Sequence, residues 1–335
     1  MKNNSCFNDS EVLVTGANGF IGSHLVDGLI SAGCKVHCIV RKTSNLRWVQ
    51  LKAVKLHLVD LRNPSFKIPE LHNIDYVFHC AGLTKAKSRK EYFDINARVC
   101  ETLYEQCLQF GERIKEIIHL SSLAAAGPSK NGALVDEDSL LNPVTYYGKS
   151  KKAGEDIALK YSENLPIKIL RPPVVYGPRE ENLFNFFKMV KKGWALQIGD
   201  TPKKLSLIYI ADLIQAMIQA CGKSPTKNKI YFITDGEFYS WEDITRNAAA
   251  RMNVSTRVLR LPEVILSPIA IVFELLAIFS SKPALFDRQR MIDIRQSSWT
   301  ASSENFFRDF GFKPEFGLVA GLADTLDWYH QQKWL

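Results

Sequence analysis

The sequence lacks the cysteine and histidine patterns that bind structural metals. Its seven cysteines fall at irregular spacings, without a Cys-x-x-Cys pair or a Cys/His ligand pattern. Zinc sites and disulfide frameworks are recognised by such spacings, and disulfides belong to oxidising compartments. We therefore interpret the cysteines as reduced, mostly buried thiols of a cytoplasmic protein, and we expect no metal site.

The sequence also lacks an apolar segment of bilayer length. The apolar stretch 269–279 is interrupted by Glu274 and bounded by Pro268 and Pro283. A spanning helix needs about 20 residues. The first residues, 1–6, contain no apolar core like that of a secretory signal. Both absences favour a cytoplasmic location.

No basic run is interleaved with aromatic residues, although the chain is basic. Lysine and arginine number 43 against 35 acidic residues, which gives a formal charge of +8, and they are scattered. Nucleic-acid-binding proteins usually gather such residues in one patch. We therefore expect no nucleic-acid partner, and the excess charge favours an anionic cofactor or substrate, or an anionic membrane surface.

The chain does contain enough apolar residues for a sizeable core. It has 335 residues, of which 46% are hydrophobic. A chain of this length can bury one large core or two smaller ones. We expect one α/β domain with a smaller lobe.

The stretch 12–22 changes its hydrophobic period at three glycines, Gly16, Gly19 and Gly22. The residues 11–15 before them are aliphatic and β-branched, as in a strand. The apolar residues after them recur at helical spacing: Phe20, Ile21, Leu25, Leu29 and Ile30. Gly16 can adopt a backbone angle that other residues avoid, and Gly19 lets the main chain come close to a pyrophosphate. Gly22 lets the helix pack closely on the strand. The spacing differs from the common Gly-x-Gly-x-x-Gly, so the loop alone is a weak signal of dinucleotide binding.

Further strands are predicted at 35–40, 54–59, 75–80 and 114–120. The first ends in Arg41-Lys42, where a basic residue can pair with the 2′-phosphate of NADP, although the pair can also be simply solvated. The second ends in Asp60, which can either accept a hydrogen bond from the adenine amino group or cap the following turn. The third carries His79, which we interpret as a core residue rather than a catalytic one.

Two later stretches carry hydroxyl groups. Ser121-Ser122 follows the strand 114–120, and a helix is predicted around Tyr147 and Lys151, which lie four residues apart. Residues at this spacing share one helix face. An ammonium near a phenol favours the phenolate, so this pair suits proton exchange with a substrate hydroxyl or carbonyl.

These pieces together resemble the extended short-chain dehydrogenases/reductases of the NAD-dependent epimerase/dehydratase family, including its 3β-hydroxysteroid-dehydrogenase-like members. The matching motifs are Thr15-Gly-Ala-Asn-Gly-Phe-Ile-Gly22, Asp60-Leu61, Ser121-Ser122, Tyr147-Gly-Lys-Ser-Lys151, 171–178 and 205–213. The resemblance implies a Rossmann-type doubly wound parallel sheet in residues 1–175. It also implies a smaller C-terminal α/β substrate lobe in 176–335, with the segment 203–232 returning to the Rossmann sheet.

The resemblance also implies roles for individual residues. Tyr147 is the expected general acid/base, Lys151 lowers the pKa of Tyr147 and holds the nicotinamide ribose, and Ser122 hydrogen-bonds the reacting oxygen. The expected cofactor is NADP, or NAD, bound by residues of the strand ends and the catalytic helix: Gly16, Asn18, Gly19, Phe20, Ile21, Gly22, Arg41, Asp60, Leu61, Ala81, Gly82, Tyr147, Lys151, Pro173 and Val174.

Two substrate classes remain open for an enzyme of this kind. Sugar-nucleotide members usually have polar residues where this chain has Val174 and Ala126, and dehydratases place a carboxylate pair beside the catalytic serine, which 121–123 does not provide. A hydroxyl-rich ligand needs paired polar groups. We therefore favour an oxidoreductase acting on an apolar, sterol- or terpenoid-like alcohol or ketone over an epimerase or dehydratase. A binding protein without catalysis is disfavoured because Tyr147 and Lys151 are both present.

The segment 261–286 has three possible interpretations: a buried lobe helix, which we prefer, a flap over an apolar substrate, or a peripheral membrane helix. The arginines that follow can bind a substrate phosphate or an anionic lipid, or they can simply be solvated on a helix face: Arg288, Arg290 and Arg295. The helices predicted at 92–110 and 149–161 are those through which similar proteins dimerise, so a homodimer is expected from the resemblance.

Overall fold

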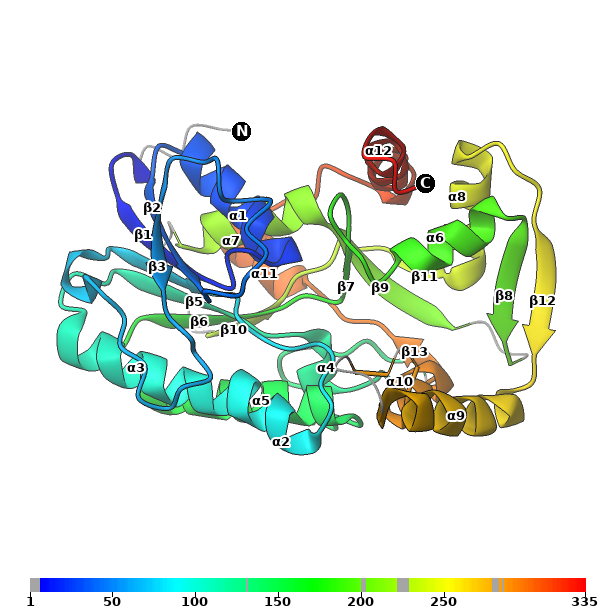
Figure 1. Cartoon of the computed structure of the whole chain (residues 1–335), viewed down its shortest axis with the longest axis horizontal. Helices are drawn as coiled ribbons and strands as arrows, with labels where there is room; N and C mark the ends of the chain where they lie inside the picture. The colour runs from blue at the N-terminus through cyan, green and yellow to red at the C-terminus, as the bar shows by residue number, and fades with distance from the viewer. Residues whose placement is uncertain (1–6, 131, 200–202, 222–228, 279–282, 285) are drawn as a thin grey trace.

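The computed structural model describes residues 7–130, 132–199, 203–221, 229–278, 283–284 and 286–335. Its centre is a seven-stranded parallel sheet in the order β10-β6-β5-β4-β1-β2-β3 (Figure 1). The strands are β1 (Glu11–Thr15), β2 (Lys35–Val40), β3 (Val54–Leu58), β4 (Tyr76–His79), β5 (Glu116–Leu120), β6 (Ile167–Arg171) and β10 (Ile230–Phe232). This order reverses between β1 and β4, which is the switch point of a doubly wound fold. The predicted Rossmann-type fold class is confirmed.

Helices cover both faces of this sheet. One face carries α1 (Phe20–Ser31), α7 (Ile210–Cys221) and α11 (Glu304–Phe310). The other carries α2 (Arg89–Phe93), a π-helical turn at Asp94–Arg98, α3 (Val99–Phe110) and α5 (Tyr146–Tyr161). Strands β4, β5 and β6 are buried along their whole length, and the buried residues include the polar Glu116, His119 and Lys168.

The C-terminal lobe is built on two small sheets. In the larger one, β9 (Lys204–Tyr209) pairs with β7 (Val174–Tyr176), β11 (Phe238–Ser240) and β13 (Ser298–Trp299). In the smaller one, β8 (Trp194–Ile198) pairs with β12 (Arg257–Leu261). The remaining helices are α4 (Leu123–Ala126), α6 (Phe184–Lys191), α8 (Trp241–Arg251), α9 (Leu266–Ile278), α10 (Arg288–Arg295) and α12 (Leu318–Gln331), with short 3-10 turns at Leu71–Asn73 and Glu263–Ile265.

The segment 203–232 returns to the Rossmann sheet only in part. Strand β10 pairs with β6 as expected, whereas β9 lies in the second sheet, so the expectation is wrong for that strand. Pro172 and Pro173 lack the N–H groups that continue a ladder, and the chain leaves the seven-stranded sheet there to form β7, which β9 then joins. Residues 222–228 of the segment lie outside the described residues.

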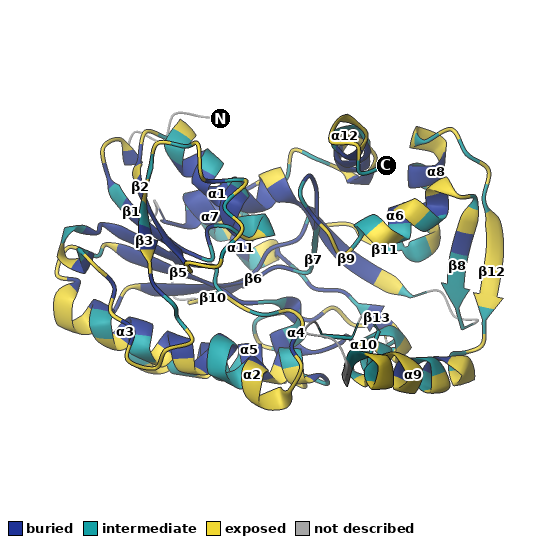
Figure 2. Ribbon diagram, in the orientation of Figure 1, coloured by how far each residue is buried: buried dark blue, intermediate teal, exposed yellow. Residues whose placement is uncertain are grey.

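The apolar segment 261–286 is not a buried lobe helix, so our preferred interpretation of it is wrong. Within α9 only Leu266 and Ala270, one turn apart, are buried, while Leu275 and Leu276 are 56% and 64% exposed. The cause is that α9 packs on one narrow side, against α10, and its other faces meet solvent (Figure 2). Residues 279–282 and 285 lie outside the described part of the chain.

The described residues bear on two expectations, one about the cysteines and one about membrane-spanning helices. All six cysteines among them are free thiols. None of the helices described has the length and apolar character needed to cross a membrane.

Helix α5 is fixed to the sheet by a buried ion pair between Glu155 and Arg171. The Arg171 guanidinium donates to both Glu155 carboxylate oxygens, at 2.9 and 2.7 Å, and both side chains are 1% exposed. Ser121 donates a third hydrogen bond to the same carboxylate at 2.5 Å. Bidentate contacts of this kind fix orientation as well as distance. The pair therefore joins α5, β6 and the end of β5.

We predict that Arg171→Met destabilises the protein by about 3–5 kcal/mol, because it leaves a buried carboxylate without its partner. Arg251→Met, which breaks the exposed pair with Asp327, should change the free energy of unfolding by about 1 kcal/mol or less. Urea unfolding followed by circular dichroism measures both. Equal effects of the two substitutions would contradict the assigned role of the buried pair.

Candidate active site

The loop between β1 and α1 has the geometry expected for binding a phosphate. Gly16 has a φ of 69°, and a Cβ at Gly22 would lie 2.1 Å from the Gly16 carbonyl oxygen, so both positions require glycine. Gly19 is the N-cap of α1 and supplies no side-chain cap. The first N–H groups of α1 are therefore left to bind an anion, as at other helix N-termini.

The ends of β1 and β4 bring a second part of the predicted cofactor site to this loop. The Ala81 N–H donates to the Thr15 hydroxyl at 3.1 Å, and a Cβ at Gly16 would lie 2.8 Å from the Ala81 nitrogen. A Cβ at Gly82 would lie 3.8 Å from the Lys151 ammonium nitrogen. The structure thus brings the glycine loop, Ala81-Gly82 and Lys151 together at one edge of the sheet.

Helix α5 carries the predicted catalytic residues at its N-terminal end. The Thr145 hydroxyl caps the helix by accepting from the Gly148 N–H at 3.1 Å, which sets Tyr147 in the first turn and Lys151 one turn later. A Cβ at Gly148 would lie 2.3 Å from the Ala124 carbonyl oxygen, so this glycine lets α5 pack closely on α4. Ser122 is the N-cap of α4 and forms a side-chain hydrogen bond with Tyr147.

The surroundings of Tyr147 shift its pKa in both directions. Burial raises the pKa of Tyr147, the hydrogen bond with Ser122 lowers it, and the negative charge of Asp293 raises it further. The Lys151 ammonium donates to the Leu120 carbonyl at 2.7 Å. The effect of Lys151 on the pKa of Tyr147 stays a prediction. Burial also lowers the pKa of Lys151 itself.

Asn96 is a site residue whose position the sequence reasoning did not use. It lies on the π-helical turn, a feature often found at functional sites. Its amide accepts from the Leu83 N–H at 2.7 Å and donates to the Ser150 hydroxyl at 2.9 Å, and Ser150 donates to the Tyr147 carbonyl at 2.8 Å. Asn96 thus connects the loop after Gly82 to the catalytic helix. A polar residue on an otherwise apolar helix face is the only sequence signal for it.

Arg41 and Asp60 lie at the neighbouring edge of the site. Arg41 is exposed, and its charge contributes to lowering the pKa of Asp60 to about 2, for which hydrogen bonds from Arg62 are the main cause. Asp60 also accepts from the Arg62 N–H at 3.0 Å, which is the turn-capping contact that the sequence left open. Leu61 is half-buried beside it.

Pro173 and Val174 lie where the chain leaves the Rossmann sheet. Both are half-buried, and Val174 pairs with Leu207 at the start of β7. Val174 also lines a small apolar cavity in the lobe, together with Phe187 and Trp241. The pair therefore stands at the junction between the cofactor domain and the lobe.

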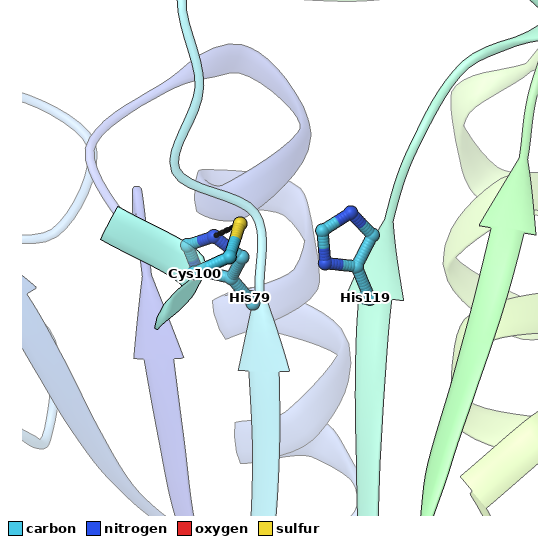
Figure 3. A group of neighbouring side chains, drawn as sticks. All are labelled: His79, Cys100 and His119. Atoms are coloured by element: carbon cyan, nitrogen blue, oxygen red, sulfur yellow. Dashed lines mark hydrogen bonds between the residues drawn. The ribbon is translucent and has the colours of Figure 1, made fainter. Parts of the chain in front are cut away.

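A buried group of possible metal ligands is formed by His79 of β4, Cys100 of α3 and His119 of β5 (Figure 3). The two ring nitrogens of His79 form hydrogen bonds with the Thr15 hydroxyl at 2.8 Å and the Cys100 sulfur at 3.5 Å. The Nδ1 of His119 forms a hydrogen bond with the Tyr104 hydroxyl at 2.6 Å. No fourth ligand joins them in the described ranges, whereas structural zinc takes four. Burial lowers the pKa of His79 to about 3, the charge of Lys151 contributes to this shift, and the same charge would repel a cation. We interpret the group as a polar part of the core.

Helix α10 closes the site from the lobe side. The Gln289 side-chain oxygen accepts from the Tyr146 N–H at 2.7 Å, and Asp293 lies one turn further along the same helix. The charge of Asp293 acts on both Tyr147 and Tyr92. Burial raises the pKa of Asp293 to about 6. Sequence reasoning missed Asp293 because nothing in the sequence places α10 against α5.

The chain is similar to known proteins in sequence and in fold. A model of the NAD dependent epimerase/dehydratase family matches residues 12–233. Ceramide reductase of Caulobacter vibrioides is 27% identical over 328 residues, covering 97% of this chain and 96% of the relative. Sterol-4-alpha-carboxylate 3-dehydrogenase (decarboxylating) of Dictyostelium discoideum is 25% identical, covering 88% and 91%. The solved structure of UDP-glucuronic acid 4-epimerase from Bacillus cereus, in complex with UDP-glucuronic acid and NAD, has a TM-score of 0.74 at 24% identity, covering 96% and 99%.

The fold and these relatives define an enzyme of the extended short-chain dehydrogenase/reductase class. Within that class, the chain belongs to the NAD-dependent epimerase/dehydratase family. The resemblance stated from the sequence is thereby confirmed.

We predict an inflection near pH 6 in the pH profile of turnover, caused by Asp293. Above this pH the carboxylate is charged and helps to keep Tyr147 protonated, and below it the carboxyl is neutral. The Asp293→Asn variant should lose the inflection, and its Tyr147 should titrate at lower pH than in the wild type. Asp156→Asn, which changes an exposed carboxylate on α5, should retain the wild-type profile. An unchanged profile in Asp293→Asn would exclude this assignment.

Proposed function

We propose that the protein is an NAD(P)-dependent oxidoreductase that transfers hydride at a secondary alcohol or ketone carbon of an apolar, sterol- or terpenoid-like substrate. The observation that carries the proposal is the side-chain hydrogen bond between Ser122 and Tyr147. Ala126 and Val174, where sugar-nucleotide enzymes usually have polar groups, offer no side-chain hydrogen bond. The match to a ceramide reductase over nearly the whole chain supports the apolar substrate.

The side chains suggest how a ketone would be reduced. The bound nicotinamide supplies the hydride to the carbonyl carbon. Tyr147 donates a proton to the carbonyl oxygen, and Ser122 donates a hydrogen bond that holds this oxygen. The raised pKa of Tyr147 suits the proton donor, because the phenol stays protonated at neutral pH. In alcohol oxidation the same groups act in the reverse order, with Tyr147 accepting the proton.

Residues in the structure fit the dinucleotide. The uncapped N-terminus of α1 suits the pyrophosphate, and the Lys151 ammonium, of whose three N–H donors Leu120 takes one, suits the nicotinamide ribose. Asn18, Phe20 and Ile21 lie in and directly after the glycine loop. We keep the cofactor roles of these residues and of the other predicted contacts as part of this proposal.

The alternative function is a nucleotide-sugar epimerase or dehydratase that reduces and reoxidises its cofactor within one cycle. The likeness to UDP-glucuronic acid 4-epimerase favours it at the level of the fold. The absence of a carboxylate from Ser121, Ser122 and Leu123 disfavours the dehydratase, which would need an acid and base for water elimination.

Incubation of the purified enzyme with sterols and long-chain secondary alcohols should produce net reduced nicotinamide, measured by its absorbance. UDP- and dTDP-sugars should give no net change and no epimerised product. Tyr147→Phe should bind the cofactor as the wild type does and lose about 10³-fold or more in turnover, since it lacks the proton donor. Epimerisation of a sugar nucleotide without net cofactor change would defeat the proposal, and full activity of Tyr147→Phe would remove Tyr147 from the acid/base role.

We further propose that the preferred cofactor is NADP. Arg41 and Lys42 are exposed at the end of β2, where no acidic residue is present to accept from the ribose hydroxyls. The wild type should have a higher kcat/KM with NADPH than with NADH, and Arg41→Ala should lose about 10-fold or more with NADPH while changing little with NADH. Lys35→Ala, at the opposite end of β2, is the control and should change neither value. A wild-type preference for NADH would contradict this choice.

We infer a cytoplasmic homodimer from the resemblance, with membrane contact limited to the surface of the segment 261–286. Helices α3 and α5 pack side by side and present exposed residues outward, including Leu108 and Phe110. A second copy of this pair would complete a four-helix bundle. Sedimentation equilibrium of the wild type should give twice the chain mass of 37.9 kDa, and the mass of one chain would refute the dimer.

A further inference from the structure

Helix α9 exposes an apolar surface that no other element of the described chain covers. We call this the α9 surface and define it by the following residues, which are 37% to 76% exposed: Val264, Ile271, Val272, Phe273, Leu275 and Leu276. It forms the lower edge of the lobe in Figure 1 and is largely yellow in Figure 2. Contiguous exposed apolar residues of this kind mark a contact with a protein or a membrane.

Both signs of charge occur near the α9 surface, since Asp287 and Asp293 lie on or beside α10 together with its arginines. Glu274, the only charged residue of α9, is paired with Arg288 at 2.9 Å, and Glu263 is paired with Lys203 at 2.9 Å. The exposed arginines on β12 and α10 make no ion pair with a carboxylate in the part of the chain that is described: Arg257, Arg260, Arg290 and Arg295. An apolar helix packed against a helix with exposed arginines, here Arg290 and Arg295, complements a layer of anionic lipid head groups over an apolar interior.

The α9 surface lies beside the candidate active site. Helix α9 packs on α10, where the Ser267 hydroxyl donates to the Met291 sulfur at 3.3 Å and accepts from Arg295 at 2.9 Å. Helix α10 in turn contacts the start of the catalytic helix through Gln289 and Tyr146. A membrane on the α9 surface would therefore lie one helix, α10, away from the start of the catalytic helix.

We propose that the α9 surface docks on an anionic lipid bilayer and sets the entrance of the active site against the membrane. The role of this docking, access to an apolar substrate dissolved in the bilayer, rests on the proposed function. A second copy of the chain is a less suitable occupant. A two-fold interface brings the same patch of both copies together, so the arginines of the two copies would repel one another.

Vesicle sedimentation tests this proposal directly. The wild type should sediment with vesicles of phosphatidylglycerol and phosphatidylcholine in equal parts, and binding should weaken with added salt and with phosphatidylcholine alone. The double variant Leu275→Glu/Leu276→Glu should bind the mixed vesicles about 10-fold or more weakly, since it loses apolar insertion and gains two negative charges. Leu51→Glu/Val319→Glu, which changes residues that are 98% and 68% exposed elsewhere, should bind as the wild type does.

Three results would overturn the proposal. The wild type could fail to bind the mixed vesicles, the Leu275→Glu/Leu276→Glu variant could bind them normally, or that variant could instead convert a dimer to a monomer in analytical ultracentrifugation. Circular dichroism confirms that the variants fold. Vesicle binding is measured without turnover, so a failure to bind vesicles does not bear on the proposed reaction. A failure of the proposed reaction would instead appear as absent activity on alcohols dissolved in detergent.

Discussion

The candidate site depends on the buried Glu155–Arg171 pair. Arg171 ends β6, Glu155 lies one turn after Lys151 on α5, and Ser121, which shares the carboxylate, precedes Ser122. One carboxylate therefore sets the position of the catalytic helix relative to the strand that delivers the serine. A charged, multiply hydrogen-bonded contact in a dry interior allows few alternative geometries. The hydrogen bond between Ser122 and Tyr147 follows from this arrangement.

The two halves of the proposed chemistry meet at one edge of the sheet. The loop after β1, the loop after β4 and the serines after β5 all follow the carboxyl ends of parallel strands, where doubly wound folds bind their ligands. The lobe approaches the same edge through β7 and α10. Contacts across the junction, such as Arg179 with Asp27 at 2.8 Å, join the lobe to α1. Under the proposed function, the cofactor and the substrate would both bind at this edge of the sheet.

The sequence predicted the parts of the fold that local patterns determine. The strands at 11–15 and 35–40 have the predicted bounds, and the glycine loop has the predicted backbone, because buried parallel strands and tight turns leave strong signals. Long-range packing was not predictable in the same way. The exposure of α9, the pairing of β9 with β7, and the position of Asp293 all depend on which elements meet in space. The direction of the Lys151 ammonium depends on a single carbonyl of β5.

The central claim is that hydride passes between the cofactor and the substrate carbon with net conversion. Isotope tracing tests it most directly, with reduced cofactor deuterated at C4 of the nicotinamide and an apolar ketone. The account predicts one deuterium at the carbinol carbon of the product and an equal amount of oxidised cofactor released, as measured by mass spectrometry. The contradicting result is a sugar nucleotide that is epimerised with no release of oxidised cofactor, while the apolar ketones acquire no deuterium.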